Sequence, residues 1–227
     1  MVIFTHIPKT AGTLFATGVI SPNHSREDVY DWSGYDSVDL ARLARAKVIT
    51  GHSRYGIHRL IPRRVRYCTF LREPIDRVIS YYYFVRRSKF ANYEHPDWQR
   101  ANEQSLVEFC AVPTMRNLQT RTLAGSVLSR LSSHFADGWV GRYALACATR
   151  HMRDSYEVGL TEHYSESVER LTQVFGWDHR SAGNPNVNPD RPATPPSESV
   201  REALARYNAL DVQLYRHATA RFASQAR

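Results

Sequence analysis

The sequence is poor in cysteine and lacks any long apolar run. Its three cysteines, Cys68, Cys110 and Cys147, lie far apart in a chain of 227 residues and form no CxxC pair. This spacing gives no disulfide framework, and we expect buried free thiols in a reducing compartment. No stretch of about 18 apolar residues is present, so no transmembrane helix is predicted. The short apolar run at residues 2–4 has no basic segment before it, so no signal peptide is predicted and we expect a cytoplasmic protein.

The composition favours a folded chain with anionic partners. Hydrophobic residues make up 42% of the sequence and charged residues 23%, which allows a sizeable core and argues against general disorder. The length fits one large α/β domain, and we expect residues 1–227 to form a single domain. The formal net charge of +8 attracts anions such as nucleotides, acidic glycans, nucleic acid or membrane surfaces. A solvated basic surface without a partner is the alternative explanation.

Two strand-to-helix units predict a parallel sheet. Residues 1–7 are rich in β-formers and end at Pro8, and a helix is predicted over residues 13–20. Residues 66–71 form the clearest strand, with apolar side chains on both faces, as in a central strand covered on both sides. Pro74 then occupies a favoured first-turn position of a helix. We therefore predict an α/β fold of the P-loop-like three-layer class, with a central parallel sheet flanked by helices.

The rest of the pattern predicts further regular elements and two irregular segments. Strands are predicted at residues 47–51 and 156–160. Helices are predicted at residues 38–46, 104–111, 141–152 and 165–175, the last of them closed by Gly176. The irregular segments are residues 21–37 and the Pro- and Asn-rich residues 181–196, which form a lid loop or, alternatively, a linker. Ser199 and Glu202 have capping-box spacing for one last helix that extends to Phe222.

The loop His6-Ile7-Pro8-Lys9-Thr10-Ala11-Gly12-Thr13 stands between a predicted strand and a predicted helix. Such a loop presents backbone N–H groups at a helix N-terminus, where an anion is favoured. Lys9 adds a charge, Thr10 and Thr13 add hydroxyl groups, and Gly12 allows a close approach of the backbone. The loop is not a Walker A motif, because its lysine precedes the last glycine. An ordinary strand-to-helix connection with one exposed lysine is the alternative.

A second candidate anion site follows the strand at residues 66–71. Arg72 stands at the strand end, and Ser80 lies about 9 Å along the predicted helix from Pro74 at 1.5 Å per residue. The planar guanidinium of arginine suits a terminal phosphate because it donates two hydrogen bonds at once. Alternatively, Arg72 pairs with Asp76 and Ser80 only faces the helix surface.

These two motifs, HIPKTAGT and LREPxxRxxSYYYF, resemble those of the carbohydrate sulfotransferases related to heparan sulfate 2-O-sulfotransferase. The resemblance implies that PAPS (3′-phosphoadenosine 5′-phosphosulfate) is the co-substrate and PAP the product. It places Arg72 and Ser80 on the 3′-phosphate. It places the 5′-phosphosulfate on the first loop, at Pro8, Lys9, Thr10, Ala11, Gly12 and Thr13. Leu14 departs from the family, where many members have another Ser or Thr.

A histidine is the natural base for the transfer, because its pKa near 6.5 suits removal of a hydroxyl proton. His52 follows the predicted strand at residues 47–51 and so lies at the active edge of the sheet. The resemblance points to the same residue, which stands in a Gly-His-x-x-Tyr context. A structural or acceptor-positioning role is the alternative for His52, and His58 is the second candidate base. His6 is expected to pack at a strand end, and Glu73 is a carboxylate fallback.

Two further segments have weaker indications. Gln119 and Arg121 lie in a segment similar to one in bacterial members of this group. One interpretation is that both residues orient an anionic acceptor, and a helix-end salt bridge explains Arg121 equally well. Asn186, Asn188 and Arg191 match the loop that covers the nucleotide in relatives. Which residues of 181–196 cover the nucleotide stays open.

These observations predict a sulfotransferase that moves a sulfuryl group from PAPS to a hydroxyl of a carbohydrate or glycosylated acceptor. Lys9 and His52 are its expected catalytic residues. The sequence has no HExxH motif and no Asp/His ligand cluster, and we expect no metal. The alternatives are a P-loop-like nucleotide or sugar kinase, which needs Mg²⁺, and a non-enzymatic basic module that binds anionic polysaccharide. We expect no nucleic-acid partner and no membrane span; the acceptor and the oligomeric state stay open.

Overall fold

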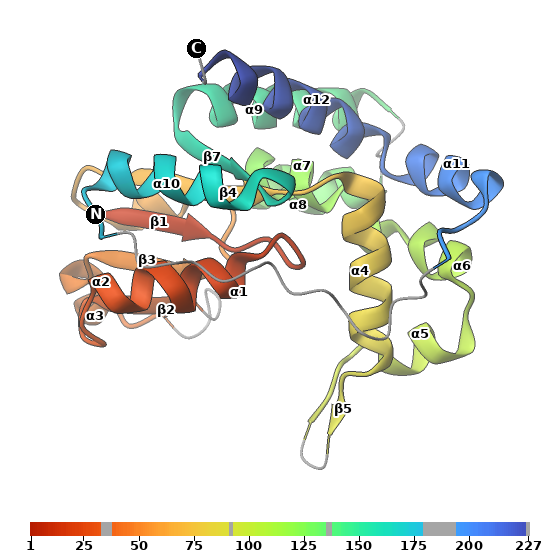
Figure 1. Ribbon diagram of the computed structural model, residues 1–227, viewed down its shortest axis with the longest axis horizontal. Helices are drawn as coiled ribbons and strands as arrows, with labels where there is room; N and C mark the ends of the chain where they lie inside the picture. The colour runs from red at the N-terminus through yellow and green to blue at the C-terminus, as the bar shows by residue number, and fades with distance from the viewer. Residues whose placement is uncertain (33–37, 91–92, 135–137, 179–193, 226–227) are drawn as a thin grey trace.

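Five parallel strands form the centre of the molecule. The structure is a computed structural model, and it describes residues 1–32, 38–90, 93–134, 138–178 and 194–225. The strands are β1 (Val2–Thr5), β2 (Val29–Trp32), β3 (Val48–Gly51), β4 (Arg66–Leu71) and β7 (Tyr156–Leu160). Their order in the sheet is β2-β3-β1-β4-β7, and every neighbouring pair is parallel. This arrangement, with helices on both sides (Figure 1), confirms the predicted α/β class.

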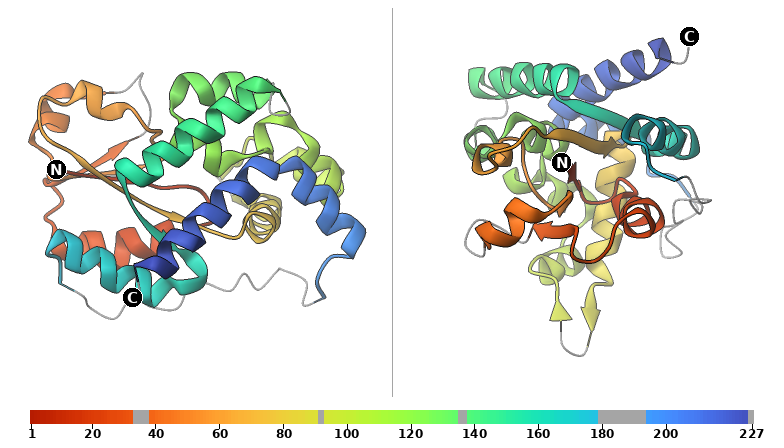
Figure 2. Two further views of the ribbon diagram at one scale, coloured as in Figure 1. Left: turned by 90° about the horizontal axis from the view of Figure 1, so that it is seen from above. Right: turned by 90° about the vertical axis from the view of Figure 1, so that its left-hand side faces the viewer.

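The two faces of the sheet are covered by different helices (Figure 2). One face packs against a helical run from Gly12 to Asn23 and against α10 (Tyr164–Phe175). That run consists of α1 (Gly12–Phe15), the π-helical η1 (Ala16–Ile20) and α2 (Ser21–Asn23). The other face packs against α3 (Leu40–Arg45), α7 (Leu118–Ala124), α9 (Trp139–Asp154) and α12 (Ala209–Ser224).

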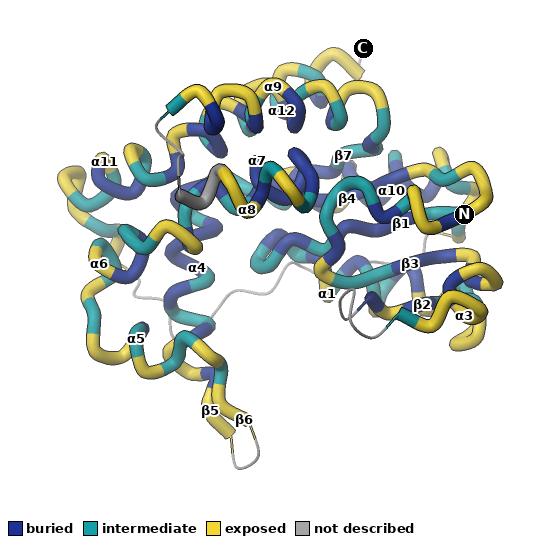
Figure 3. The backbone as a smooth tube through the Cα atoms, turned by 180° about the vertical axis from the view of Figure 1, so that it is seen from behind, coloured by how far each residue is buried: buried dark blue, intermediate teal, exposed yellow. Residues whose placement is uncertain are grey.

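Strand β4 shows why this sheet needs helices on both sides. Tyr67 and Leu71 belong to the core beneath α7, α9 and α12, whereas Cys68 and Phe70 belong to the core beneath α1 and α10. All four side chains are at most 1% exposed (Figure 3). Full burial of an apolar side chain contributes roughly 1.5–3 kcal/mol, so both faces of this strand stabilise the fold.

A third apolar cluster lies beside the sheet and is built around α4 (Pro74–Arg86). Pro74 occupies the first turn of this helix, as predicted. The helix leads into a small antiparallel hairpin, β5 (Lys89–Phe90) and β6 (Tyr93–Glu94). Helix α4 packs against α5 (Trp98–Glu103), α6 (Leu106–Ala111) and α11 (Glu198–Tyr207). Figure 1 shows α4 running away from the sheet edge toward the hairpin.

Several predictions about local structure were wrong. Residues 21–37 were predicted to be irregular but contain α2 and the strand β2. The predicted last helix is two helices, which are separated at Asn208. Ser199 is not the N-cap, because α11 begins at Glu198 after Ser197 and has no side-chain cap. The remaining elements are η2 (Ile57–Leu60), η3 (Pro113–Met115), η4 (Thr161–His163) and α8 (Ser126–His134).

Other local predictions were confirmed. Gly176 ends α10 in the left-handed conformation with a φ of 67°, and Trp177 N–H donates to the Thr172 carbonyl, as in a Schellman motif. The three cysteines are free and buried. Among the helices that the structure describes, none combines the length and the apolar character needed to cross a bilayer.

Candidate functional site

The candidate site lies where four parallel strands end. His6 follows β1, His52 follows β3, Arg72 follows β4 and Thr161 follows β7. The carboxyl ends of parallel strands meet at one edge of the sheet, which is where open α/β sheets bind ligands. The backbone joins the first two ends, because His6 N–H donates to the Gly51 carbonyl at 2.9 Å. The fold therefore gathers the residues that the two sequence motifs supplied.

The loop between β1 and α1 has an unusual backbone. Lys9 and Ala11 both adopt the left-handed conformation, with φ values of 69° and 63°. A residue with a side chain is strained there by about 1–2 kcal/mol, so the surroundings must hold the loop. The buried Thr10 helps, because its hydroxyl donates to the Ile7 carbonyl at 2.9 Å. Its hydroxyl thus serves the loop itself, whereas Thr13 is exposed at the start of the helix.

Lys9 lies in a cationic and partly apolar environment. Its ammonium is 4.5 Å from the centre of the Phe84 ring, and Arg72 donates to the Lys9 carbonyl at 3.3 Å. Burial, together with the charges of Arg87 and Arg72, lowers the pKa of Lys9 to about 8. A lysine whose charged form is destabilised by neighbouring cations is a favourable place for an anion.

One face of α4 borders this loop. Ser80, Phe84 and Arg87 have i, i+4 and i+7 spacing, which places them on one side of the helix. The Phe84 ring contacts the Lys9 ammonium, and the charge of Arg87 lowers the pKa of Lys9. This side of the helix therefore faces the loop. Ser80, two turns from the helix start, is 5% exposed. Glu73, the fallback base, is the N-cap of α4 and accepts the Asp76 N–H at 2.7 Å.

Three side chains from two other segments, α7 and η4, fix the backbone at the end of β4. The Gln119 amide accepts from Arg72 N–H and donates to the Arg72 carbonyl, both at 2.9 Å. Thr161 donates to the Leu71 carbonyl at 3.1 Å, and Glu162 accepts from Glu73 N–H at 2.9 Å. Arg72 therefore starts from a backbone position that is held on several sides.

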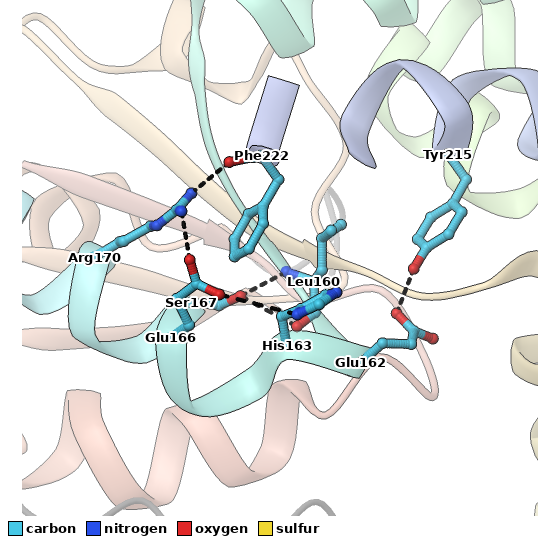
Figure 4. A network of polar contacts seen from close by, with 8 residues as sticks. All are labelled: Leu160, Glu162, His163, Glu166, Ser167, Arg170, Tyr215 and Phe222. Atoms are coloured by element: carbon cyan, nitrogen blue, oxygen red, sulfur yellow. Dashed lines mark hydrogen bonds and ion pairs between the residues drawn. The ribbon is translucent and has the colours of Figure 1, made fainter. Parts of the chain in front are cut away.

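Glu162 is itself anchored to the C-terminal helix. Its second carboxylate oxygen accepts from the Tyr215 hydroxyl at 2.6 Å (Figure 4). Within α10, Arg170 forms an ion pair with Glu166 at 2.5 Å, and it donates a hydrogen bond to the Phe222 carbonyl of α12 at 3.0 Å. These contacts join η4 and α10 to α12 beside the end of β7.

His52 has a defined orientation. Its Nδ1 lies 2.7 Å from the His6 carbonyl, and the two imidazole rings are 4.8 Å apart. A carbonyl only accepts hydrogen bonds, so Nδ1 is the donor and Nε2 of neutral His52 keeps its lone pair. His52 is exposed. The His6 ring is largely buried, and burial lowers its pKa to about 4, with His52 and Lys9 acting in the same direction. His6 thus packs at the strand end, as predicted, and supports His52.

His58 lies elsewhere. Its Nδ1 is 2.9 Å from the Tyr67 hydroxyl, and Tyr67 is near the start of β4, not its end. Both residues line a cavity of about 320 Å³ that also includes Arg66 and Tyr156, the first residues of β4 and β7. The second candidate base is therefore associated with the amino ends of these strands, away from Arg72.

The acceptor residues suggested in the α7 segment have structural partners. Arg121 is 6% exposed and donates to the carbonyls of Ser129 at 3.0 Å and Thr114 at 2.9 Å. Its described hydrogen bonds thus stabilise loop and helix carbonyls. Gln119 is 1% exposed, and its side chain bonds to the backbone of Arg72. Sequence reasoning missed this role because residues 72 and 119 share no local pattern.

Two further predictions concern the loop over the nucleotide and the absence of a metal. Asn186, Asn188 and Arg191 lie outside the described residues. Within the part of the chain that is described, no group of three or more His, Cys, Asp or Glu side chains is arranged to hold a metal ion.

Comparison with known proteins gives a relationship in sequence. No protein-family model matches the chain. A Drosophila melanogaster protein described as heparin sulfate O-sulfotransferase is 25% identical over 170 residues, which cover 69% of this chain and 48% of that protein. The chain is related in sequence to this sulfotransferase. It spans about half the length of this curated sulfotransferase relative. The structure of mouse sulfotransferase SULT7A1 complexed with PAP matches with a TM-score of 0.42 and 14% identity, over 79% of this chain and 60% of that one.

Proposed function

We propose that this chain is a PAPS-dependent sulfotransferase that transfers a sulfuryl group to a hydroxyl of a carbohydrate or glycosylated acceptor. The observation that carries the proposal is the cluster of Lys9, Arg72 and Arg87 beside two strand ends, with Lys9 destabilised in its charged form. A nucleotide with phosphates at two positions and a sulfuryl group supplies the anionic charge that this cluster favours. The sequence relationship to a sulfotransferase supports the same assignment.

The residues divide between the two ends of the nucleotide. The loop from Pro8 to Thr13 would hold the 5′-phosphosulfate, mainly through the backbone N–H groups of residues 10–13 and the Lys9 ammonium. In this division the hydroxyl of Thr10 stabilises the loop by its bond to Ile7, and the exposed hydroxyl of Thr13 is available to a ligand. Arg72 and Ser80 would hold the 3′-phosphate.

Lys9 and His52 would act on the reacting groups. PAPS supplies an activated sulfuryl group and a phosphate leaving group. The Lys9 ammonium stabilises negative charge on the leaving oxygen, and its apolar contact with Phe84 strengthens that effect by excluding water. Nε2 of His52 takes the proton of the acceptor hydroxyl, because Nδ1 is occupied by the His6 carbonyl. No proton transfer through Glu73 is needed, since its carboxylate caps α4.

The partners and setting follow the same proposal. A carbohydrate acceptor fits the net charge of +8, because many polysaccharides are anionic. We propose a cytoplasmic enzyme, a single domain over residues 1–227, no nucleic-acid partner and no metal requirement.

The test is transfer of label from ³⁵S-PAPS to a panel of acceptor oligosaccharides, with PAP binding measured by calorimetry. We expect wild-type protein to bind PAP and to sulfate at least one acceptor class without added metal. Lys9→Ala and Arg72→Ala should weaken PAP binding, and Lys47→Ala, an exposed lysine paired with Asp28, is the matched control.

The same panel tests the rival functions. Transfer from ATP that EDTA abolishes would indicate a kinase. Salt-sensitive heparin binding by a folded protein that ignores PAP would indicate a basic polysaccharide-binding module. Either result would replace the sulfotransferase proposal.

A further inference from the structure

The side chain of Gln119, on α7, holds the backbone of Arg72 at the end of β4. Its side chain is 1% exposed, and its amide makes two hydrogen bonds of 2.9 Å to a single residue, one to Arg72 N–H and one to the Arg72 carbonyl. A primary amide can satisfy both groups at once because it carries a donor and an acceptor side by side. Methionine or leucine would fill the same volume without either bond.

The backbone of Gln119 is itself fixed by a hydrogen bond to Asp211. Its backbone N–H donates to the buried Asp211 carboxylate at 3.1 Å, and Thr120 N–H donates to the other carboxylate oxygen at 2.7 Å. Asp211 thus caps the start of α7. The arrangement is reciprocal, because the Asn117 side chain accepts from Leu210 N–H at 3.0 Å at the start of α12. The starts of two helices therefore fix the backbone from which the Gln119 side chain extends.

Gln119 bonds both backbone polar groups of Arg72 itself, whereas Thr161 and Glu162 hold its neighbours Leu71 and Glu73. Leu71 is the last strand residue and Pro74 begins α4, so residues 72 and 73 form the whole connection. Proline has no N–H, and the Arg72 carbonyl is bonded by Gln119. A shift of this two-residue connection would carry the Arg72 guanidinium away from the Lys9 carbonyl, its partner at 3.3 Å.

We propose that Gln119 is a positioning residue that aims Arg72 at the 3′-phosphate of the bound nucleotide. The inference rests on the proposed function. Gln119 touches no ligand itself; it acts by fixing the backbone of Arg72. Removal of its amide should therefore weaken binding of ligands that carry a 3′-phosphate and leave ligands without one almost unchanged.

The experiment compares two ligands in three proteins. Calorimetry with PAP and with adenosine 5′-phosphate is performed on wild type, Gln119→Met and Gln119→Glu. We expect Gln119→Met to weaken PAP binding by about tenfold or more, as small misplacements of binding groups do, and to change binding of adenosine 5′-phosphate by less than about twofold. Gln119→Glu keeps the acceptor for Arg72 N–H and should give an intermediate loss.

Two controls separate positioning from a general packing defect. Gln213→Met changes an exposed glutamine that bonds only within α12, to the Ala209 carbonyl at 3.3 Å, and should leave both ligands unaffected. In Arg72→Ala protein the Gln119→Met change should have no further effect on PAP binding, because the residue it positions is gone.

The outcomes are distinguishable. If wild-type protein binds PAP and Gln119→Met binds it equally well, the positioning role is wrong and the sulfotransferase proposal stands. Equal losses for both ligands would assign Gln119 to packing alone and also overturn the role. If wild-type protein does not bind PAP, both the function and the inference built on it are wrong.

Discussion

The ring of His6 occupies the space that a side chain at residue 12 would need. A methyl group added to Gly12 would collide with Cδ2 and Nε2 of that ring. The ring has little freedom to retreat, since it stacks on Phe4 at 5.8 Å and contacts the His52 ring at 4.8 Å. The glycine of the loop therefore serves the histidine pair as well as any bound phosphate.

Gly12→Ala should destabilise the protein by about 1–3 kcal/mol, the usual cost of overpacking, and should slow transfer by displacing His6 and with it His52. Thermal unfolding and the transfer assay measure the two effects. Gly18→Ala is the matched control, because among the described residues no atom outside its own helix backbone and chain neighbours lies within 4 Å of the added methyl group, and alanine is the better helix former by about 1 kcal/mol. Equal stability of Gly12→Ala and Gly18→Ala would contradict the packing argument.

His52→Ala should slow sulfuryl transfer by about 10²-fold or more while leaving PAP affinity unchanged, because a general base acts on the acceptor and not on the nucleotide. Single-turnover kinetics and calorimetry check the two parts separately. His58→Ala is the control, since the His58 imidazole is bonded to Tyr67 near the start of β4. Normal turnover by His52→Ala would remove this residue from the mechanism.

PAP affinity should fall between pH 7 and pH 9.5. The pKa of free Lys9 is lowered to about 8 by burial and by the charges of Arg87 and Arg72, so the ammonium loses its proton in this range. An ordinary lysine would stay charged until about pH 10.4. Since the anion binds the charged form, the ligand raises the pKa of Lys9 and binding takes up a proton. We expect an affinity loss of about tenfold at pH 9.5.

Calorimetry in two buffers of different ionisation enthalpy measures that proton directly. Lys9→Arg provides the control, because a guanidinium keeps its charge throughout the range and its binding should not depend on pH there. If the PAP affinity of the wild-type protein does not change between pH 7 and pH 9.5, Lys9 is an ordinary solvated lysine.

The central sheet was predictable where each strand carries its own signal. Residues 66–71 and 156–160 were predicted at the bounds that the structure has, because residues 66–71 are apolar on two faces, residues 156–160 carry apolar side chains at alternate positions, and both segments end at polar residues. Strand β2 was missed. Its alternation of buried Tyr30 and Trp32 with exposed Asp31 extends over only four residues, and polar turn formers precede it. At the end of the sheet, pairing with β3 decides the conformation more than the local sequence does.

The helix break at Asn208 was beyond the reach of periodicity. The apolar residues of α11 and α12 continue one helical pattern, and Asn208 is 0% exposed. Its side chain accepts from Asn117 N–H at 3.1 Å, a contact between residues 91 positions apart. A break that depends on such a distant partner leaves no local trace.

In the candidate site, too, residues with a local signal were predicted and a residue with a distant partner was missed. Lys9 and Arg72 were identified because they lie in short contiguous motifs, and the structure brings them together. Gln119 holds Arg72 across 47 positions, and no spacing within one helix indicates that contact. The residues proposed to touch a ligand were therefore easier to predict than the residues that place them.

The buried charges of Arg77 on α4 and Asp211 on α12 attract each other electrostatically and supply the last prediction. Both are at most 1% exposed. Burial lowers the pKa of Arg77 and raises that of Asp211, and each charge opposes the effect of burial on the other. Both oxygens of Asp211 accept backbone N–H groups at the start of α7. Asp211→Asn should therefore destabilise the protein by about 3 kcal/mol, because it leaves the Arg77 charge buried without its partner.

Urea unfolding measures this change. The double variant Asp211→Asn/Arg77→Met should recover part of the loss, since removal of both charges is often close to neutral. Asp154→Asn is the matched control, because that carboxylate pairs with Arg153 at the surface and contributes less than about 1 kcal/mol. If Asp211→Asn unfolds at the wild-type urea concentration, the pair does not hold the junction, and the backbone N–H groups of α7 need only a neutral acceptor there.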